Sequence, residues 1–199
     1  MISCVLLAAG FSSRFGSPKA LAKVNQKTVI EHLQHQVLGT SVGEIIVVLG
    51  DHADMIKPYL LNHRRVKFVY NKDYNLGQTS SFKVGLQSIH SDSEGIMLLP
   101  IDYPAVKVKT LEILMEYFLK NKPLILIPAF EGQKGHPPIF DIKLKEEFLG
   151  LDNEAGLNTV AFYHQGETLV VDVRDEGIVA TFNTREDFEK IKKGLKNII

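Results

Sequence analysis

Short apolar runs of strand length alternate with longer segments of helical periodicity along most of this chain. The apolar runs lie at residues 2–6, 45–49, 66–70, 96–99 and 124–127. The segments with helical spacing lie at residues 29–38, 53–61, 80–89 and 110–119. This alternation predicts an α/β fold of the Rossmann-like, doubly wound type, in which helices cover both faces of a mostly parallel sheet.

The last third of the chain has a less regular pattern. We predict a further strand at residues 168–173, a short returning strand near 179–182 and a final helix at 184–195. Residues 28–31 read Thr-Val-Ile-Glu, the spacing of a capping box, and predict the start of the first helix. The chain has no internal repeat, linker or low-complexity segment, so we expect a single domain over residues 1–199.

Composition narrows the class of protein. Lys and Arg together number 23, as do Asp and Glu, and the chain has no long basic run. Nucleic acid and anionic membranes are therefore not expected as partners. The one cysteine, Cys4, lies in the first apolar run and is predicted to be a small buried hydrophobe. No stretch approaches the roughly 20 apolar residues that span a bilayer, and the short N-terminal run lacks a basic region, so we expect a cytoplasmic protein.

A loop of small residues and two cations follows the strand predicted at residues 2–6. The loop reads Leu7-Ala8-Ala9-Gly10-Phe11-Ser12-Ser13-Arg14-Phe15-Gly16-Ser17-Pro18-Lys19. Ligands bind at the carboxyl ends of strands in folds of this type. Because small side chains let backbone amides approach a ligand closely, and Arg14 and Lys19 add positive charge, the loop predicts a phosphate-binding site.

The spacing of this loop excludes the better-known phosphate loops. Gly10 and Gly16 are one residue too far apart for a Walker loop, and there is no Gly-x-Gly-x-x-Gly. The loop instead resembles the signature Leu-Ala-Ala/Gly-Gly-x-Ser-x-Arg-x-Gly-x-x-Lys of the molybdopterin nucleotidyltransferase family, and every fixed position is filled. The resemblance extends along most of the chain and is weakest after residue 150. It implies that the nucleotide is bound by Leu7, Ala8, Ala9, Gly10, Arg14 and Lys19.

A second candidate, Asp102, follows the apolar run at residues 96–99 in the segment Pro100-Ile101-Asp102-Tyr103-Pro104. An aspartate between two prolines often only forms a turn. A carboxylate just past a strand beside a phosphate site can also hold Mg²⁺, which binds one or two carboxylates together with water and phosphate oxygens. The segment is similar to the Asp-x-Pro motif of the family, and this resemblance implies that Asp102 is the metal ligand.

A third candidate segment, residues 74–81, combines small and hydroxyl side chains ahead of a predicted helix. Capping of the helix would explain one hydroxyl residue there but does not need all three. The segment resembles the Gly-x-Ser-Ser-Ser loop of the family, which lies against the nucleobase and ribose. The resemblance implies nucleotide contacts from Gly77, Thr79, Ser80 and Ser81.

Two later segments bear on the acceptor and the metal. Gly135-His136-Pro137 resembles a marker of the cytidylyl branch of the family, and this implies that His136 lies near the acceptor phosphate or the metal. Before the final helix the family has Asp-x-Asp-Thr-Pro-Glu-Asp, whereas this chain reads Thr181-Phe182-Asn183-Thr184-Arg185-Glu186-Asp187. Both leading aspartates are absent. An asparagine oxygen can ligate Mg²⁺, so Asn183 is the candidate for the second ligand.

Taken with the resemblance, these residues imply an enzyme that transfers CMP from CTP to a phosphorylated acceptor of molybdopterin type and releases pyrophosphate. Mg²⁺ is the implied cofactor, Arg14, Lys19 and Asp102 are the implied catalytic residues, and a molybdoenzyme is a candidate receiver of the product. Two alternatives stay open. One is transfer of GMP or transfer to a sugar phosphate, and the other is a carrier that binds nucleotide or cofactor without turnover.

Overall fold

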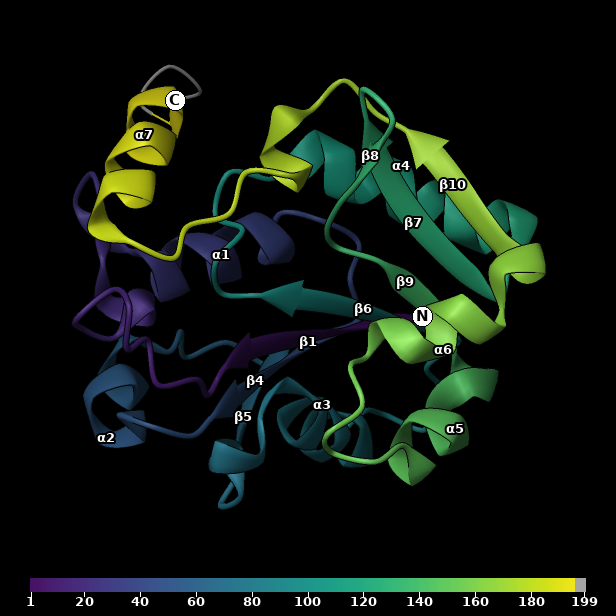
Figure 1. The fold of residues 1–199 in the computed structure, drawn as a ribbon, viewed down its shortest axis with the longest axis horizontal. Coiled ribbons are helices and arrows are strands. Elements are labelled where there is room, and N and C mark those ends of the chain that lie inside the picture. Colours follow the sequence, from purple (N-terminus) through teal and green to yellow (C-terminus); the bar gives the residue numbers. More distant parts are fainter. Residues whose placement is uncertain (196–199) are drawn as a thin grey trace.

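An eight-stranded sheet runs through the protein in the computed structural model, which describes residues 1–195 (Figure 1). The strands are β1 (Ile2–Ala8), β4 (Glu44–Leu49), β5 (Val66–Tyr70), β6 (Gly95–Pro100), β7 (Ile125–Phe130), β8 (Gln133–Lys134), β9 (Ile139–Asp141) and β10 (Thr168–Asp172). Their order is β10-β7-β9-β6-β1-β4-β5, with β8 paired to β7. Only β8 and β9 pair antiparallel with their neighbours in this sheet. The predicted fold class is therefore confirmed.

Helices cover both faces of the sheet. The hydrophobic core on one face includes residues of α1 (Val29–Leu38), α2 (Ala53–Ile56), α4 (Val108–Asn121) and α7 (Arg185–Leu195). The core on the other face includes residues of α3 (Gln78–Gln87), α5 (Lys145–Gly150) and α6 (Asn158–Tyr163). Figure 1 shows β1, the first-coloured strand, in the middle of this arrangement. The carboxyl end of β1 therefore lies near the middle of the row formed by the carboxyl ends of the parallel strands.

The continuous apolar run of β1 follows from its central position. Cys4 and Leu6 are buried in the core on one face, and Val5 and Leu7 in the core on the other. A parallel strand that is buried on both faces needs apolar side chains at every position rather than at alternate ones. Burial raises the pKa of the Cys4 thiol to about 12, so this residue is the inert core side chain that its place in the sequence predicts.

The first helix begins where the capping box predicts. The Thr28 backbone N–H donates to Glu31 Oε2 at 2.8 Å, and the Glu31 N–H donates to Thr28 Oγ1 at 3.4 Å. Such a cap stabilises a helix by about 1 kcal/mol. The cap fixes the start of α1, the helix through which the chain passes from the phosphate loop to the next strand of the sheet, β4.

The structure differs from the predicted elements in three ways: one strand is missing, one helix is shorter, and several short elements are additional. Residues 179–182 form no strand, because the chain there follows a short 3₁₀ turn, Glu176–Ile178. The helix predicted at 53–61 is shorter and ends as a 3₁₀ turn containing Pro58, which has no backbone N–H to continue it. The short elements β2 (Lys23–Val24), β3 (Lys27–Thr28), β8, β9, α5 and α6 were not predicted. They are too short for a periodic pattern to emerge.

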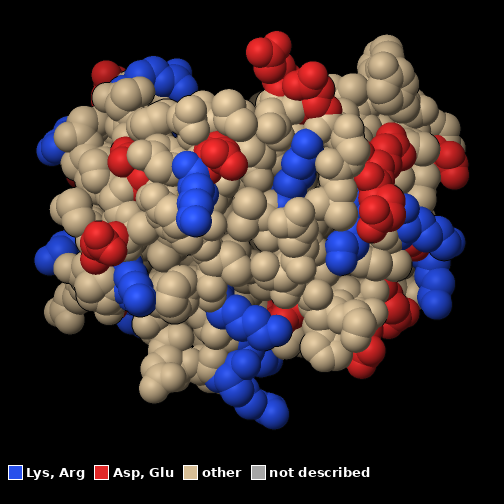
Figure 2. Space-filling view, turned by 90° about the horizontal axis from the view of Figure 1, so that it is seen from below, with Lys and Arg blue, Asp and Glu red and all other residues tan. Residues whose placement is uncertain are grey.

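Charges of both signs are interspersed over the surface. Figure 2 shows acidic and basic side chains on the face seen from below, mixed over most of it, with several basic side chains gathered at its lower middle. Within residues 1–195, no helix has both the length and the apolar character needed to cross a bilayer.

Candidate functional site

A cleft of about 400 Å³ opens at the carboxyl ends of β1 and β6. It falls within the size range of small-molecule sites, which runs from roughly 300 to 1,000 Å³. Five segments line it: the loop after β1, Ile56 of α2, residues 74–81 at the start of α3, residues 100–102 at the end of β6, and Asn183 ahead of α7. The structure therefore brings together residues as far apart in the chain as Leu7 and Asn183, 176 positions.

The loop after β1 forms a compact turn around Ser12. The Ser12 carbonyl accepts hydrogen bonds from the N–H groups of Phe15 and Gly16, at 3.0 and 3.1 Å. Its Oγ accepts from the Lys19 N–H at 3.1 Å, and its φ of 54° lies in the left-handed region. Ser12 is a residue whose structural role the sequence analysis did not identify, although it is one of the fixed positions of the signature.

This turn leaves a run of backbone amides available to a ligand. The amides of residues 10–14 donate to no other backbone carbonyl in the described part of the chain. Successive free N–H groups in such a loop form a concave site for an anion. Of the six residues predicted in this loop, all line the cleft: Leu7, Ala8, Ala9, Gly10, Arg14 and Lys19.

The two cations of the loop meet at one asparagine. Arg14 Nη2 and Lys19 Nζ each donate to Asn183 Oδ1 at 3.0 Å. Lys19 Nζ also lies 3.5 Å from Asp102 Oδ2. Burial lowers the pKa of Lys19, and the neighbouring Asp102 carboxylate opposes this shift. The predicted catalytic residues Arg14, Lys19 and Asp102 are thus gathered around a single point.

Asp102 and Asn183 supply the oxygen atoms with which this cleft could hold a divalent cation. Among residues 1–195, no group of three or more His, Cys, Asp and Glu side chains is placed to hold a metal. One carboxylate and one amide oxygen nevertheless fit Mg²⁺, which completes its coordination with water and phosphate oxygens. Since Asn183 Oδ1 accepts hydrogen bonds from both cations, it would have to exchange at least one of them for the metal.

The segment at residues 74–81 divides into cleft-lining and internal residues. Gly77 and Ser81 line the cleft, and so do Tyr74, Asn75 and Gln78, which the sequence analysis passed over. Gly77 has φ +92° and ψ −166°, a conformation that favours glycine.

Two residues predicted in this segment do not line the cleft. Thr79 is 3% exposed and its hydroxyl donates to the Ala155 carbonyl at 2.7 Å. The Ser80 hydroxyl lies 2.9 Å from both the Asp73 and the Gly77 carbonyls. We therefore revise the expected nucleotide contacts of Thr79 and Ser80, because their hydroxyl groups are used to hold the loop together.

His136 does not line the cleft but packs on Tyr103, the residue after Asp102. Its ring stacks on Tyr103 with ring centroids 4.4 Å apart, and its Nδ1 is buried without a hydrogen-bond partner in the described residues. Burial lowers the pKa of His136, while the Asp102 carboxylate acts in the opposite direction. His136 thus packs against the residue next to Asp102, and its predicted place near the acceptor phosphate or the metal stays a prediction.

Two aromatic side chains stand at the rim of the cleft. Phe11, from the loop after β1, and Tyr74, from the segment before α3, form an edge-to-face pair with centroids 5.3 Å apart. Phe11 is 52% exposed, although it is apolar. The pair connects the loop after β1 to the segment before α3, both of which line the cleft.

Comparisons with known sequences agree on one family. A family model described as "MobA-like NTP transferase domain" matches residues 4–168. A probable molybdenum cofactor guanylyltransferase of Bacillus mycoides is 28% identical over 199 residues, covering 97% of this chain and 96% of the relative. The molybdenum cofactor cytidylyltransferase of Escherichia coli is 22% identical, with 96% of each chain covered. A probable UDP-N-acetylglucosamine pyrophosphorylase of Acanthamoeba polyphaga mimivirus is 32% identical over 62% of this chain, which spans half of that relative.

Solved structures share the fold. A nucleotidyl transferase from Methanothermobacter thermautotrophicus superimposes with a TM-score of 0.86 at 23% identity, over 100% of this chain and 99% of the other. A protein of Mycobacterium tuberculosis, solved as a complex with manganese, gives a TM-score of 0.75 at 22% identity over 96% and 98% of the two chains.

Proposed function

We propose that this chain, which belongs to the MobA-like NTP transferase domain family and is a nucleotidyltransferase, transfers CMP from CTP to a phosphorylated acceptor of molybdopterin type. The observation that carries the proposal is the convergence of Arg14, Lys19 and Asp102 on a cleft floored by free backbone amides. Pyrophosphate is the second product, and a molybdoenzyme is the proposed receiver of the first.

The reaction needs positioning and charge neutralisation rather than a covalent enzyme intermediate. An oxygen of the acceptor phosphate attacks the α-phosphorus of the nucleotide, and the bond from that phosphorus to the bridging oxygen of the β-phosphate breaks in line with the attack. The acceptor phosphate is already ionised near neutral pH, so no general base is required. Pyrophosphate leaves with the electron pair of the broken bond.

Each site residue has a proposed part in this reaction. The amides of residues 10–14 hold phosphate oxygens, and the exposed Arg14 guanidinium binds the β- and γ-phosphates. The less exposed Lys19 ammonium stabilises the charge that develops around the α-phosphoryl group. Asp102 and Asn183 would hold Mg²⁺, which would supply positive charge to neutralise the phosphate oxygens.

The resemblance to the family favours a pyrimidine nucleotide at two places, Ala9 and the segment Gly135-His136-Pro137. Ala9 stands where the guanylyl branch of the family has glycine, and its methyl group packs so closely on Gly50 that a β-carbon added there would lie 2.8 Å away. The full-length match to a guanylyltransferase, at higher identity than the match to the cytidylyltransferase, favours GTP as the second candidate.

Thermal stability with each nucleotide separates the two candidates. A ligand that binds only the folded protein raises the melting temperature in proportion to the logarithm of its concentration over its Kd. We expect CTP with Mg²⁺ to raise the Tm more than GTP, ATP or UTP at equal concentration. Pyrophosphate release that depends on both CTP and molybdopterin would support turnover. Equal or larger shifts with GTP would reverse the assignment, and binding without release would favour a carrier.

A further inference from the structure

A buried asparagine connects the end of β5 to the wall of the cleft. Asn71 directly follows β5 and is 2% exposed. Its Oδ1 accepts a hydrogen bond from the Asp73 N–H at 3.0 Å. Its Nδ2 donates to Ser80 Oγ and to Ser81 Oγ, both at 3.0 Å. One side chain therefore ties the strand to the first turn of α3, where Ser81 lines the cleft.

The Asp73 N–H fixes which way the Asn71 amide faces. A backbone N–H can only donate, so the atom of Asn71 that it contacts has to be the oxygen. The Nδ2 group is then turned toward the two serines, and each serine oxygen accepts from it. Both hydroxyl protons consequently point away from Asn71.

The two serines differ in where those protons can go. The Ser80 proton has two carbonyl acceptors at 2.9 Å, from Asp73 and Gly77. The Ser81 hydroxyl has only a long contact of 3.4 Å to the Gly77 carbonyl. Ser81 lines the cleft although the residue is only 4% exposed, and its hydroxyl proton, unlike those of Thr79 and Ser80, has no short contact to a carbonyl, so it is the one available to a ligand.

We infer that Asn71 is a positioning residue that fixes Ser81 as a hydrogen-bond donor toward the bound nucleotide. The group that Ser81 contacts is then an acceptor, such as a base carbonyl, a ring nitrogen or a ribose oxygen. This inference rests on the proposed function, because it takes the cleft to hold a nucleoside triphosphate. It adds a residue that the motifs did not indicate, six positions before Gly77.

Asn71→Asp tests the inference at nearly constant shape. The carboxylate keeps an acceptor for the Asp73 N–H but offers no donor, so the Ser81 hydroxyl would donate to it instead of to the ligand. We expect Asn71→Asp and Ser81→Ala each to weaken CTP binding by about 10-fold, the effect of one hydrogen bond. The double variant should be no weaker than the weaker single variant, because both changes remove the same donor.

Two controls isolate the effect in a calorimetric titration. Inorganic triphosphate carries the phosphates without a base or ribose, so its Kd reports the effect of the charge added by Asn71→Asp. The ratio of the Kd for CTP to the Kd for triphosphate then reports the nucleoside contact alone. Ser80→Ala removes the other partner of Asn71 and should leave this ratio within about 2-fold of the wild type, which is less than the effect of one hydrogen bond. The Tm without ligand verifies that each variant is folded.

The possible results are distinguishable. A ratio for Asn71→Asp that equals that of the wild type would overturn the inference, and so would full additivity with Ser81→Ala. If wild-type protein binds none of the four nucleoside triphosphates, the proposed function itself fails. Wild-type binding together with an unchanged ratio in Asn71→Asp refutes only the positioning role.

Discussion

The two sides of the cleft are built in different ways. The phosphate loop is a continuous segment of the chain, in which backbone amides and Ser12 set the shape. The opposite wall combines Asp102 and Asn183 from segments 81 residues apart. It meets the loop through the side-chain contacts of Lys19 and Arg14, the hydrogen bond from the Ile101 N–H to the Leu7 carbonyl, and the packing of Phe15 on Phe182. The phosphate loop can therefore form locally, whereas the opposite wall exists only once the sheet and α7 are in place.

The two sides of the cleft also differ in the source of their charge: backbone amides on the loop side and side chains on the opposite wall. Backbone amides offer fixed partial charges that no side-chain substitution removes, so phosphate binding on the loop side resists mutation. The opposite wall has one carboxylate facing two cations, with the neutral Asn183 between them. A single substitution there changes the net charge of the site. We expect the wall to control turnover and the loop to control nucleotide affinity.

Asp102→Ala should have the largest effect on the enzyme. It removes the only carboxylate that lines the cleft among the described residues, so we expect kcat to fall by roughly 10³-fold or to below detection, at any attainable Mg²⁺ concentration. The measurement is pyrophosphate release as a function of Mg²⁺, with CTP binding followed in parallel. Asp102→Asn is the matched control for shape and should be nearly as inactive. Substantial activity in either variant would place the metal ligand elsewhere.

Lys19→Ala should give the next largest effect. Lys19 touches both sides of the cleft, since its Nζ contacts Asp102 and Asn183 while its backbone belongs to the loop. We expect kcat to fall by roughly 10²-fold and CTP affinity to fall much less, because its charge acts mainly on the transition state. Lys19→Arg keeps the charge and serves as control. Equal losses of affinity and kcat would instead make Lys19 a ground-state phosphate anchor.

The same contrast explains how much of the site could be predicted from sequence. All six predicted loop residues line the cleft. They could be predicted because they follow one another along one strand and the turn after it. Asn183 could be named only through the family resemblance, since nothing local indicates that it meets Arg14 and Lys19. Thr79 looked like a ligand contact, but its hydroxyl is used by Ala155, which lies 76 residues away.

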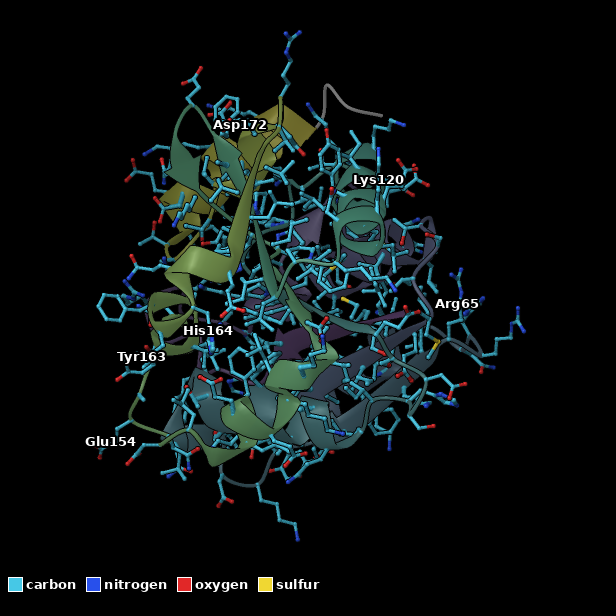
Figure 3. All side chains as sticks on the ribbon, turned by 90° about the vertical axis from the view of Figure 1, so that its right-hand side faces the viewer. Arg65, Lys120, Glu154, Tyr163, His164 and Asp172 are labelled. Carbon is cyan, nitrogen blue, oxygen red and sulfur yellow. The ribbon has the colours of Figure 1, made fainter. Side chains whose placement is uncertain are left out.

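The fold shows the same limit. Long strands and helices were predictable because their periodicity extends over several residues. The three-residue β9 lies antiparallel between β6 and β7, and α5 and α6 cover the sheet in the stretch that follows it. Figure 3 shows Tyr163 and Glu154 at the outer edge of this part of the molecule. Its short elements gain their structure from packing on the sheet rather than from a local pattern.

Asn183→Asp would sharpen the comparison by giving the wall a second carboxylate. We expect the Mg²⁺ concentration for half-maximal rate to fall several-fold, because hard cations bind carboxylates more strongly than amides. The added negative charge faces Arg14 and Lys19, so CTP binding without metal should weaken. Rates across a Mg²⁺ series and titrations with chelator measure the two effects. Asn183→Ser is the neutral control, and an unchanged Mg²⁺ dependence in Asn183→Asp would place residue 183 outside the coordination shell.

The smallest effect concerns His136, on which the wall is packed. Burial lowers the pKa of His136 in the folded protein below its ordinary value of 6.5, which applies to the unfolded chain. At a pH between the lowered and the ordinary pKa, the unfolded chain therefore binds a proton that the folded protein does not. Stability is therefore lost as the pH falls through this window. His136→Gln should reduce the loss of Tm between pH 7.5 and pH 5.5 by about 2 °C. Burial also lowers the pKa of His32, so this residue accounts for part of the Tm loss that persists in the variant.

His164 provides a control of opposite sign for this last prediction. The hydrogen bond to Glu147 raises its pKa, so its contribution to stability is complete below its ordinary value of 6.5 and is lost as the pH rises through the raised value. His164→Gln should therefore make the loss of Tm on acidification larger, whereas His136→Gln makes it smaller. Melting curves of the two variants at both pH values test this directly. If both substitutions shift the acid-side Tm in the same direction, the buried, neutral state of His136 is not what sets the acid stability of this wall.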